Sequence, residues 1–354
     1  MTFTALAAAI LGAVSLTSAP AAPQARTSQA VAESVRQHLA AGRPAEALVQ
    51  YEELTGRWKT PSPELLGAIV KAFAEPHRRN EEARVRADVC DALLVLGPDG
   101  ACTAELNKIA NDSTAEIGAR LAAASALVEH SAPGARDVVN LVVGAAMTAS
   151  PSVAADGLAR LPPAISTEPL KRLAMSDDRD ARYVATLALI HRQTDDVVPT
   201  LRAVAADTDA GAARLVAYIG LAATGDPGGL KVLRETLPLI KGRERLEAAL
   251  ALTTLKDPQG PPLLQSILAG EHELQRVEAA EVLYPKVPDL ARPILTNAAA
   301  SSNPWVRIRG LQAFSTLGLP STPAIRRAMG DSNAAVAVAA LGLVAKETRR
   351  VSKK

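Results

Sequence analysis

The stretch PWVRIRGLQAFSTLG, residues 304–318, has the spacing of an amphipathic helix that begins at a proline, yet it places the charged Arg307 among apolar neighbours. The same arrangement occurs 31 residues earlier around Arg276, and 31 residues before that around Arg245. Self-similarity at a period of about 20–50 residues is typical of repeat architectures. The returning arginine therefore indicates a structural repeat.

The repeat extends over most of the chain when each arginine is taken as position zero. This position falls at Arg86, Arg120, Ala154, Arg182, Arg214, Arg245, Arg276, Arg307 and Ala337. Position +3 is small in nearly every copy. Position +7 is large and apolar in all of them: Leu93, Leu127, Leu161, Leu189, Leu221, Leu252, Leu283, Phe314 and Val344. Positions +1, +3, +4, +7 and +8 share one face of a helix, so we expect the position +7 side chains in one continuous core.

A shorter apolar run precedes each of these helices and ends in turn-forming residues, as in EPLKRLAMSDDRD at 168–180 and ARPILTNAAASSNP at 291–304. Such a run predicts a second helix and a turn, which gives a unit of about 31 residues. Neither helix can bury its apolar face alone, so successive units are expected to stack into a right-handed superhelix. The predicted fold is all-α, an α-solenoid of about nine helical hairpins over residues 81–348.

The turns add a second recurring residue. In SDDRDARYVATLALI an aspartate, Asp177 or Asp178, precedes Arg182, and Asp112 and Asp207 stand in the turns of two other units. This pattern resembles HEAT repeats, and more closely the short HEAT-like repeats also found in phycobilisome lyases. The resemblance covers residues 81 to about 347 and implies the fold, but it implies little about function, because the family serves many roles.

The repeated arginine most simply has a structural role. A guanidinium group has five donors in a fixed fork, so it can reach a turn carboxylate or carbonyl of its own or the neighbouring unit. We expect this of Arg182, Arg214, Arg276 and Arg307 in particular. The alternative is a row of arginines that binds an anionic ligand.

The amino terminus is expected to be a signal peptide, residues 1–25. Its apolar run, ALAAAILGAVSL at residues 5–16, is too short to span a bilayer, which takes about 20 residues. Ala19, Pro20 and Ala21 supply a small-x-small cleavage site. We expect a bacterial protein that is exported to the periplasm or secreted, without a stable membrane span; an uncleaved anchor or a buried helix is the alternative. The basic tail, residues 349–354, is expected to be a solvated end.

Residues 26–80 precede the array. The stretch AAGRPAEALVQYEEL, residues 40–54, resembles a tetratricopeptide repeat, with Gly42 ending one helix and Ala47, Leu48 and Tyr51 on the inner side of the next. At most one and a half such units fit. We expect a helical hairpin that caps the exposed core of the first HEAT-like unit; an independent peptide-binding module is the alternative.

The sequence offers little chemistry. Its five histidines lie far apart, and no nucleophile elbow, P-loop or dinucleotide-binding fingerprint is present. The formal charge of +2 argues against nucleic acid as a partner, because phosphate binding requires a basic face. We expect no catalytic residue, cofactor or metal. Cys90 and Cys102 are predicted to lie too far apart along a helical hairpin for a disulfide, although an oxidising compartment leaves that pairing open.

The leading functional hypothesis is a non-catalytic, exported and monomeric scaffold that binds a protein or peptide on its concave face. A lyase or chaperone-like relative of the phycobilisome lyases, which attach bilins, is the alternative that the resemblance implies. A purely structural envelope spacer is the third.

Positions +2 and +5 of each repeat are expected to look toward the concave side. In the middle of the array they become apolar, which predicts an exposed patch between acidic rims. The patch comprises Val184, Leu187, Val216, Ile219 and Leu250. Such patches mark interaction sites. The alternative is a tight curvature that buries these side chains between helices.

Overall fold

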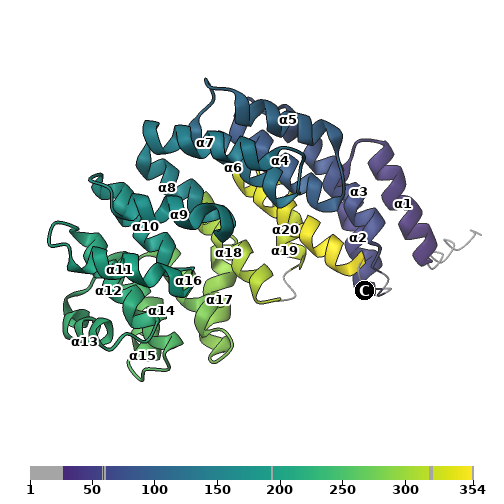
Figure 1. Cartoon of the computed structure of the whole chain (residues 1–354). Helices are drawn as coiled ribbons and strands as arrows, with labels where there is room; N and C mark the ends of the chain where they lie inside the picture. Colours follow the sequence, from purple (N-terminus) through teal and green to yellow (C-terminus); the bar gives the residue numbers. More distant parts are fainter. Residues whose placement is uncertain (1–26, 58, 60, 193, 319–321, 353–354) are drawn as a thin grey trace, which may run out of the picture.

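The computed structural model describes residues 27–352, apart from 58, 60, 193 and 319–321. In this part of the chain every regular element is a helix and no strand occurs (Figure 1). The all-α prediction is confirmed. The predicted signal peptide lies outside the described residues. None of the described helices combines the length and the apolar character that a membrane crossing requires.

Within the described residues, nine helices carry the repeated arginine position and follow one another in a row. They are α4 (Ala83–Leu96), α6 (Ile117–Glu129), α8 (Pro151–Arg160), α10 (Arg179–Ile190), α12 (Ala212–Ala223), α14 (Gly242–Thr254), α16 (Glu273–Leu283), α18 (Pro304–Thr316) and α20 (Ala334–Ser352). Each packs against the next, whereas the helices between them touch each other little. Since helices on the inside of a curved array lie closer together, this row is the inner one.

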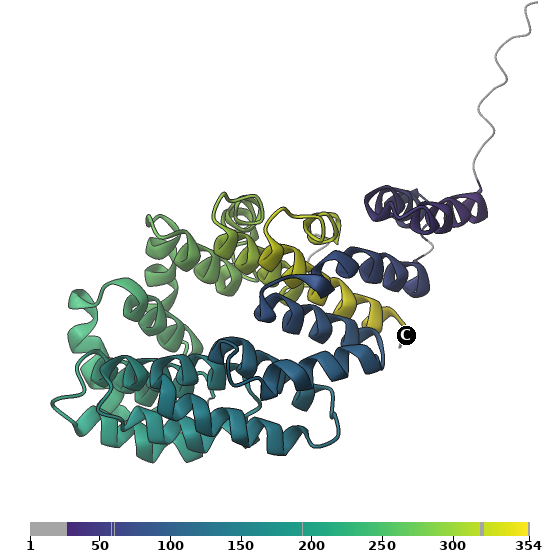
Figure 2. The same ribbon diagram turned by 90° about the horizontal axis from the view of Figure 1, so that it is seen from above.

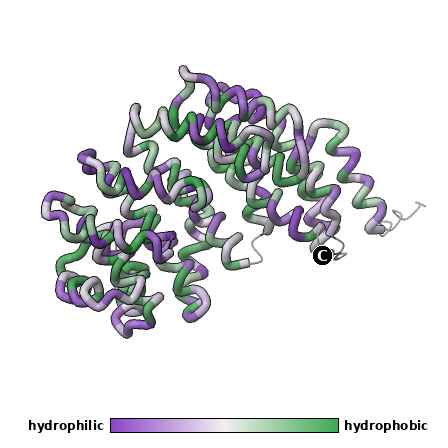
Figure 3. Tube along the Cα trace, viewed as in Figure 1, coloured by the Kyte–Doolittle hydropathy of each residue, from purple (hydrophilic) through white to green (hydrophobic). Residues whose placement is uncertain are grey.

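The outer row consists of the helices that alternate with the inner ones. They are α5 (Gly100–Asn111), α7 (Ala135–Ala149), α9 (Pro163–Ala174), α11 (Val198–Ala206), α13 (Pro227–Thr236), α15 (Gly260–Leu268), α17 (Pro288–Ala298) and α19 (Thr322–Ala328). Three 3-10 turns, η1 (Glu75–Arg79), η2 (Asp195–Val197) and η3 (Leu237–Leu239), complete the connections. Hydrophobic and hydrophilic residues alternate along the helices, as amphipathic hairpins require (Figure 3). The chain is a stack of sequential helical hairpins.

The inner row closes on itself. Helix α20 packs closely along α4 and also along α3 (Pro63–Ala74), so the last inner helix lies against the first one as well as against α18. Both views place the yellow carboxyl-terminal helix beside the blue amino-terminal ones (Figures 1 and 2). The expected superhelix therefore completes one turn and forms a ring.

Ring closure corrects the expectation for residues 26–80. The hairpin of α1 (Ser28–Ala40) and α2 (Pro44–Arg57) packs mainly on α3, while the open side of α4 is covered by α20. The Tyr51 ring on α2 lies 5.1 Å from the guanidinium carbon of Arg326 on α19. The cap expected at this end is therefore the last repeat itself, and the amino-terminal hairpin is an addition to the outside of the joint.

The repeat register is confirmed in the core. All nine position +7 side chains are buried, from Leu189 at 0% to Phe314 at 7% exposed. The expectation of one continuous core is wrong at Leu252. This residue belongs to a smaller cluster with Ile219 and Leu233, separate from the cluster that holds the other eight position +7 side chains. Glycine at position +3 allows close helix packing: a Cβ on Gly310 would lie 2.9 Å from the amide nitrogen of Ala299.

The repeated arginine reaches the turns, as predicted. Arg182 donates to the Ser176 carbonyl and to the Asp207 carboxylate, both at 2.7 Å. Arg307 donates in the same way to the Ser301 carbonyl and, through two nitrogens, to Asp331. Three others donate to a carbonyl at the end of the preceding helix: Arg120 to Ala110, Arg214 to Ala205 and Arg276 to Leu268. Each such arginine therefore ties a hairpin to the turn before or after it.

Candidate functional site: a groove on the inner face of α4, α6 and α8

The predicted apolar patch is not an exposed surface. Val216 and Ile219 are 0% and 1% exposed and belong to the core. Val184, Leu187 and Leu250 are half-buried. Because two of the five side chains lie beneath the surface, the prediction of one contiguous exposed patch is wrong.

The cause is the tight curvature that was the alternative expectation. Helices α10 and α14 come together across α12, which carries Val216 and Ile219. His191 Nε2, just past the end of α10, lies 3.5 Å from Glu247 Oε2 on α14. The pKa of the Tyr183 hydroxyl on α10 is raised, first by burial and then by the charge of Glu244 on α14. Ile219 itself packs in the core with Leu233 of α13 and Leu252 of α14.

Beyond α14 the inner face is closed by a chain of ion pairs, which we call the charge ladder: Glu247, Arg243, Glu278, Arg309 and Glu281. Arg243 contacts Glu247 within α14 and Glu278 on α16, each at 2.7 Å. Arg309 on α18 contacts Glu281 and Glu278 in turn. Helices α14 and α16 have few close backbone contacts, so these charges supply much of their connection.

The ladder is buried at one end. The Glu247 side chain is 2% exposed. Burial alone would raise the pKa of Glu247, but the His191 hydrogen bond and the charge of Arg243 outweigh it and hold that pKa below its ordinary value. The carboxylate is therefore kept charged inside the protein by its partners.

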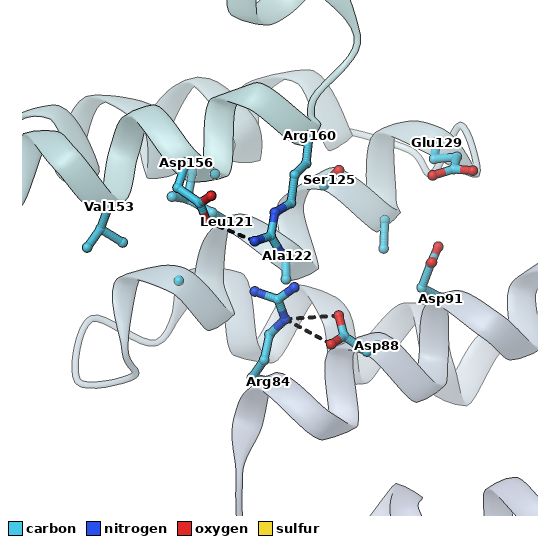
Figure 4. Close-up of a pocket in the computed structure, with 13 residues that line it drawn as sticks. Arg84, Asp88, Asp91, Leu121, Ala122, Ser125, Glu129, Val153, Asp156 and Arg160 are labelled. Atoms are coloured by element: carbon cyan, nitrogen blue, oxygen red, sulfur yellow. Dashed lines mark hydrogen bonds and ion pairs between the residues drawn. The ribbon is translucent and has the colours of Figure 1, made fainter. Parts of the chain in front are cut away.

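The opposite side of the ring carries an open groove. A hollow of about 210 Å³ lies over α4, α6 and α8 (Figure 4). Its floor comes from α6, where Gly118, Ala122 and Ser125 are too small to fill the space. The walls are charged: Arg84, Asp88 and Asp91 on α4, Asp156 and Arg160 on α8, and Glu129 at the end of α6.

Ion pairs within single helices order the two walls. Arg84 Nε donates to both carboxylate oxygens of Asp88, at 3.0 and 2.9 Å. Arg160 Nη2 donates to Asp156 at 2.9 Å. Both pairs are four residues apart, the spacing that brings two side chains together on one face of a helix. Figure 4 shows the two guanidinium groups pointing toward each other above Ala122, with the aspartates on either side.

The groove is acidic on balance. Four carboxylates (Asp88, Asp91, Glu129, Asp156) against two guanidinium groups leave a formal charge of −2. Asp91 Oδ1 lies 2.8 Å from His130 Nε2, and that histidine belongs to a neighbouring hollow of about 370 Å³. Burial raises the pKa of Asp88, although the Arg84 charge and hydrogen bond oppose that rise. This groove can bind a polar, charged segment, because charged side chains line both of its walls.

A further pair of reactive side chains lies on α4 and α5. Cys90 and Cys102 are both buried and form no disulfide. Among residues 27–352 with their gaps, no three histidine, cysteine, aspartate or glutamate side chains come close enough to hold a metal ion.

Comparison with models of known protein families gives no match for this chain, and comparison with curated proteins gives none either.

The sequence contained a signal for the groove that the patch hypothesis passed over. Taken alone, Asp88 and Asp91 indicate a solvated surface, because acidic residues at positions +2 and +5 are ordinary surface residues. The informative feature is the neighbour: the equivalent positions of the second unit are Ala122 and Ser125. Small residues between two charged helices leave room for a ligand.

Proposed function

We propose that the protein is a non-catalytic, exported scaffold of the HEAT type that binds a segment of a protein partner in the groove on α4, α6 and α8. The groove itself carries this proposal. The same repeat positions are covered at α12 and filled by the charge ladder at α14 to α18, whereas here small side chains leave a hollow between charged walls.

The chemistry of the walls favours a polypeptide. Repeat arrays typically use their inner curve to bind extended partners. A groove with a formal charge of −2 repels a phosphate backbone, so nucleic acid is a poor ligand. Side chains of both signs in a partner could meet Asp91 and Glu129 at one end and the guanidinium groups at the other. Export rests on the apolar run and cleavage site of residues 1–25, and kinship with HEAT repeats rests on the aspartate and arginine pattern.

Site-specific photo-crosslinking tests the proposal. A photoreactive amino acid replaces Ser125 on the groove floor, and in a matched control it replaces Leu141, which is 59% exposed on the outer helix α7. After illumination of the producing cells, we expect a discrete protein adduct from position 125 that is missing from position 141. Fractionation of the same cells shows whether the protein is exported.

Three results would contradict the proposal. No adduct from position 125 would favour the structural spacer. The same adducts from both positions would indicate unspecific contact. A covalently bound bilin on the purified protein or its adduct would favour the lyase-like alternative.

A further inference from the structure

The two guanidinium groups of the groove keep donors that their own ion pairs do not use. Arg84 uses Nε for Asp88, and Arg160 uses Nη2 for Asp156. Within the described part of the chain, the remaining donors of Arg84 (Nη1 and Nη2) and of Arg160 (Nε and Nη1) make no hydrogen bond. Each aspartate lies to the side, so the guanidinium groups face each other without an anion between them (Figure 4).

Two like charges that point at one another repel, and the repulsion grows as water is removed. Long arginine side chains at an exposed surface could swing apart, since Arg84 is 36% and Arg160 56% exposed. Their aspartates instead hold them from opposite walls, and the charge of Arg160 is close enough to act on Asp88. The walls thus keep free donors directed at the same point above Ala122.

We propose that Arg84 and Arg160 form a clamp for a carboxylate of the bound partner, an aspartate or glutamate side chain of the polypeptide segment. The proposal rests on the proposed function and names the group that the groove recognises. Guanidinium forks match a carboxylate in geometry, and charge-assisted hydrogen bonds are the strong ones.

Charge selects a monoanion over a dianion. Arg84 and Arg160 are balanced by Asp88 and Asp156, so the clamp starts at a formal charge of zero. A carboxylate brings it to −1, and Asp91 and Glu129 lie farther along the groove (Figure 4). A phosphate dianion would meet twice the attraction of the two guanidinium groups but also twice the repulsion of the four acidic residues, so a groove with a formal charge of −2 disfavours it more than a monoanion. The clamp therefore fits a carboxylate better than a phosphate.

A titration followed by nuclear magnetic resonance tests the clamp without knowledge of the partner. The full chain, labelled with ¹⁵N, is titrated with the α-N-methylamide of N-acetylglutamate, whose side-chain carboxylate is its one charged group, and the Nε–H resonances of Arg84 and Arg160 are recorded. We expect a saturable shift of both resonances in the millimolar range, where a small monoanion with few contacts should bind. The α-N-methylamide of N-acetylglutamine, which has the same shape without the charge, should give no saturable shift, and inorganic phosphate should bind more weakly than the glutamate derivative.

Variants provide the matched controls. Arg160→Gln should weaken the response at Arg84 at least about tenfold, because half of the clamp is lost. Arg179→Gln, at an exposed arginine of α10, should leave the titration unchanged. The melting temperature of each variant shows whether it is folded. No saturable shift, an unchanged shift in Arg160→Gln, or tighter binding of phosphate would each overturn the carboxylate clamp.

Failure of this inference is distinguishable from failure of the proposed function. A saturable response to the glutamate derivative without any adduct from position 125 would leave the clamp standing and remove the protein partner. An adduct that persists undiminished in the Arg84→Gln/Arg160→Gln double variant would keep the partner and remove the clamp.

Discussion

The two sides of the ring use the same repeat positions for opposite purposes. At α4 and α8 each arginine pairs with an aspartate of its own helix, Arg84 with Asp88 and Arg160 with Asp156, and these side chains stay 36–62% exposed. At α14 to α18 Arg243 also pairs within its helix, with Glu247, but the chain of pairs continues between helices, as from Arg243 to Glu278. Charges joined within a helix leave the space between helices open, whereas charges joined across helices close it. The open groove and the charge ladder contain the same residue types. They differ in whether an arginine also has its ion-pair partner on a neighbouring helix.

The largest expected effect on stability comes from breaking the charge ladder. Arg243→Met removes the cation that contacts both Glu247 and Glu278, and it leaves the Glu247 carboxylate buried without its strongest partner. Loss of one partner of a buried pair costs about 3–5 kcal/mol of unfolding free energy. Urea unfolding measures it. The double variant Arg243→Met/Glu247→Leu should recover part of the loss; a single variant as stable as the wild type would refute the role of the ladder.

The next largest loss of stability is expected from a substitution in the hydrophobic core. Leu221→Ala removes a position +7 side chain that is 4% exposed, and the cavity should cost about 2–5 kcal/mol of stability. Thermal unfolding is the measurement. A melting temperature within error of the wild type would mean that the repeat register is misassigned.

Loss of a repeated arginine should reduce stability by a smaller amount, on either side of the ring. Arg182→Ala leaves the Ser176 carbonyl and the Asp207 carboxylate without their donor, which should cost about 1–3 kcal/mol. Arg245→Ala is the matched control, since Arg245 contacts Ser266 only at 3.4 Å. Adduct yield per folded molecule should stay intact in both variants. Loss of the adduct with unchanged stability would instead favour an arginine row that binds an anion.

A fall in pH should destabilise the charge ladder, but it should not remove stability through Asp88 in the groove. The pKa of Glu247 is lowered by its partners, so its stabilisation is present above the ordinary glutamate pKa of about 4.3 and is lost as the pH falls toward the folded-state value. Asp88 has a raised pKa, so its protonation favours the folded state as the pH falls. We expect Glu247→Gln to flatten the acid limb of a stability profile between pH 6 and 3, roughly the range of carboxyl titration, and Asp88→Asn not to flatten it. The reverse pattern would contradict the comparison.

The smallest effect is expected in the groove. Arg84→Gln breaks an exposed pair within one helix, and such pairs contribute about 0.2–1 kcal/mol. Urea unfolding should therefore barely distinguish this variant from the wild type. A loss as large as that of Arg243→Met would show that the groove walls are structural.

Features that recur in every repeat could be predicted from the sequence. Features that depend on closure of the whole ring could not. Leu189, Leu221 and the arginines could be placed because every unit imposes the same local requirement: an apolar face to bury and turn carbonyls to bind. The contact of α20 with α4 joins segments about 250 residues apart, and it depends on the sum of nine small rotations that no single unit encodes. The same curvature decides which inner residues are covered, which is why Val216 and Ile219 were mistaken for surface.

The groove was missed for a related reason. In the sequence, Asp88 and Asp156 look like ordinary solvated residues. Only the structure shows that the small side chains of Ala122 and Ser125, on α6, lie between them. Glu247 likewise looks like an ordinary charged residue in the sequence, because only the structure shows His191 reaching it from the end of α10.

The most direct test of the account compares the adduct yield from position 125, per folded molecule, in two arginine variants. Arg84→Gln/Arg160→Gln alters the groove, and Arg309→Gln alters the charge ladder at α18. The account predicts that the first loses the adduct while keeping its stability, and that the second loses stability while its folded fraction still forms the adduct. Full adduct yield from the groove variant, with loss of the adduct in the folded charge-ladder variant, would contradict it.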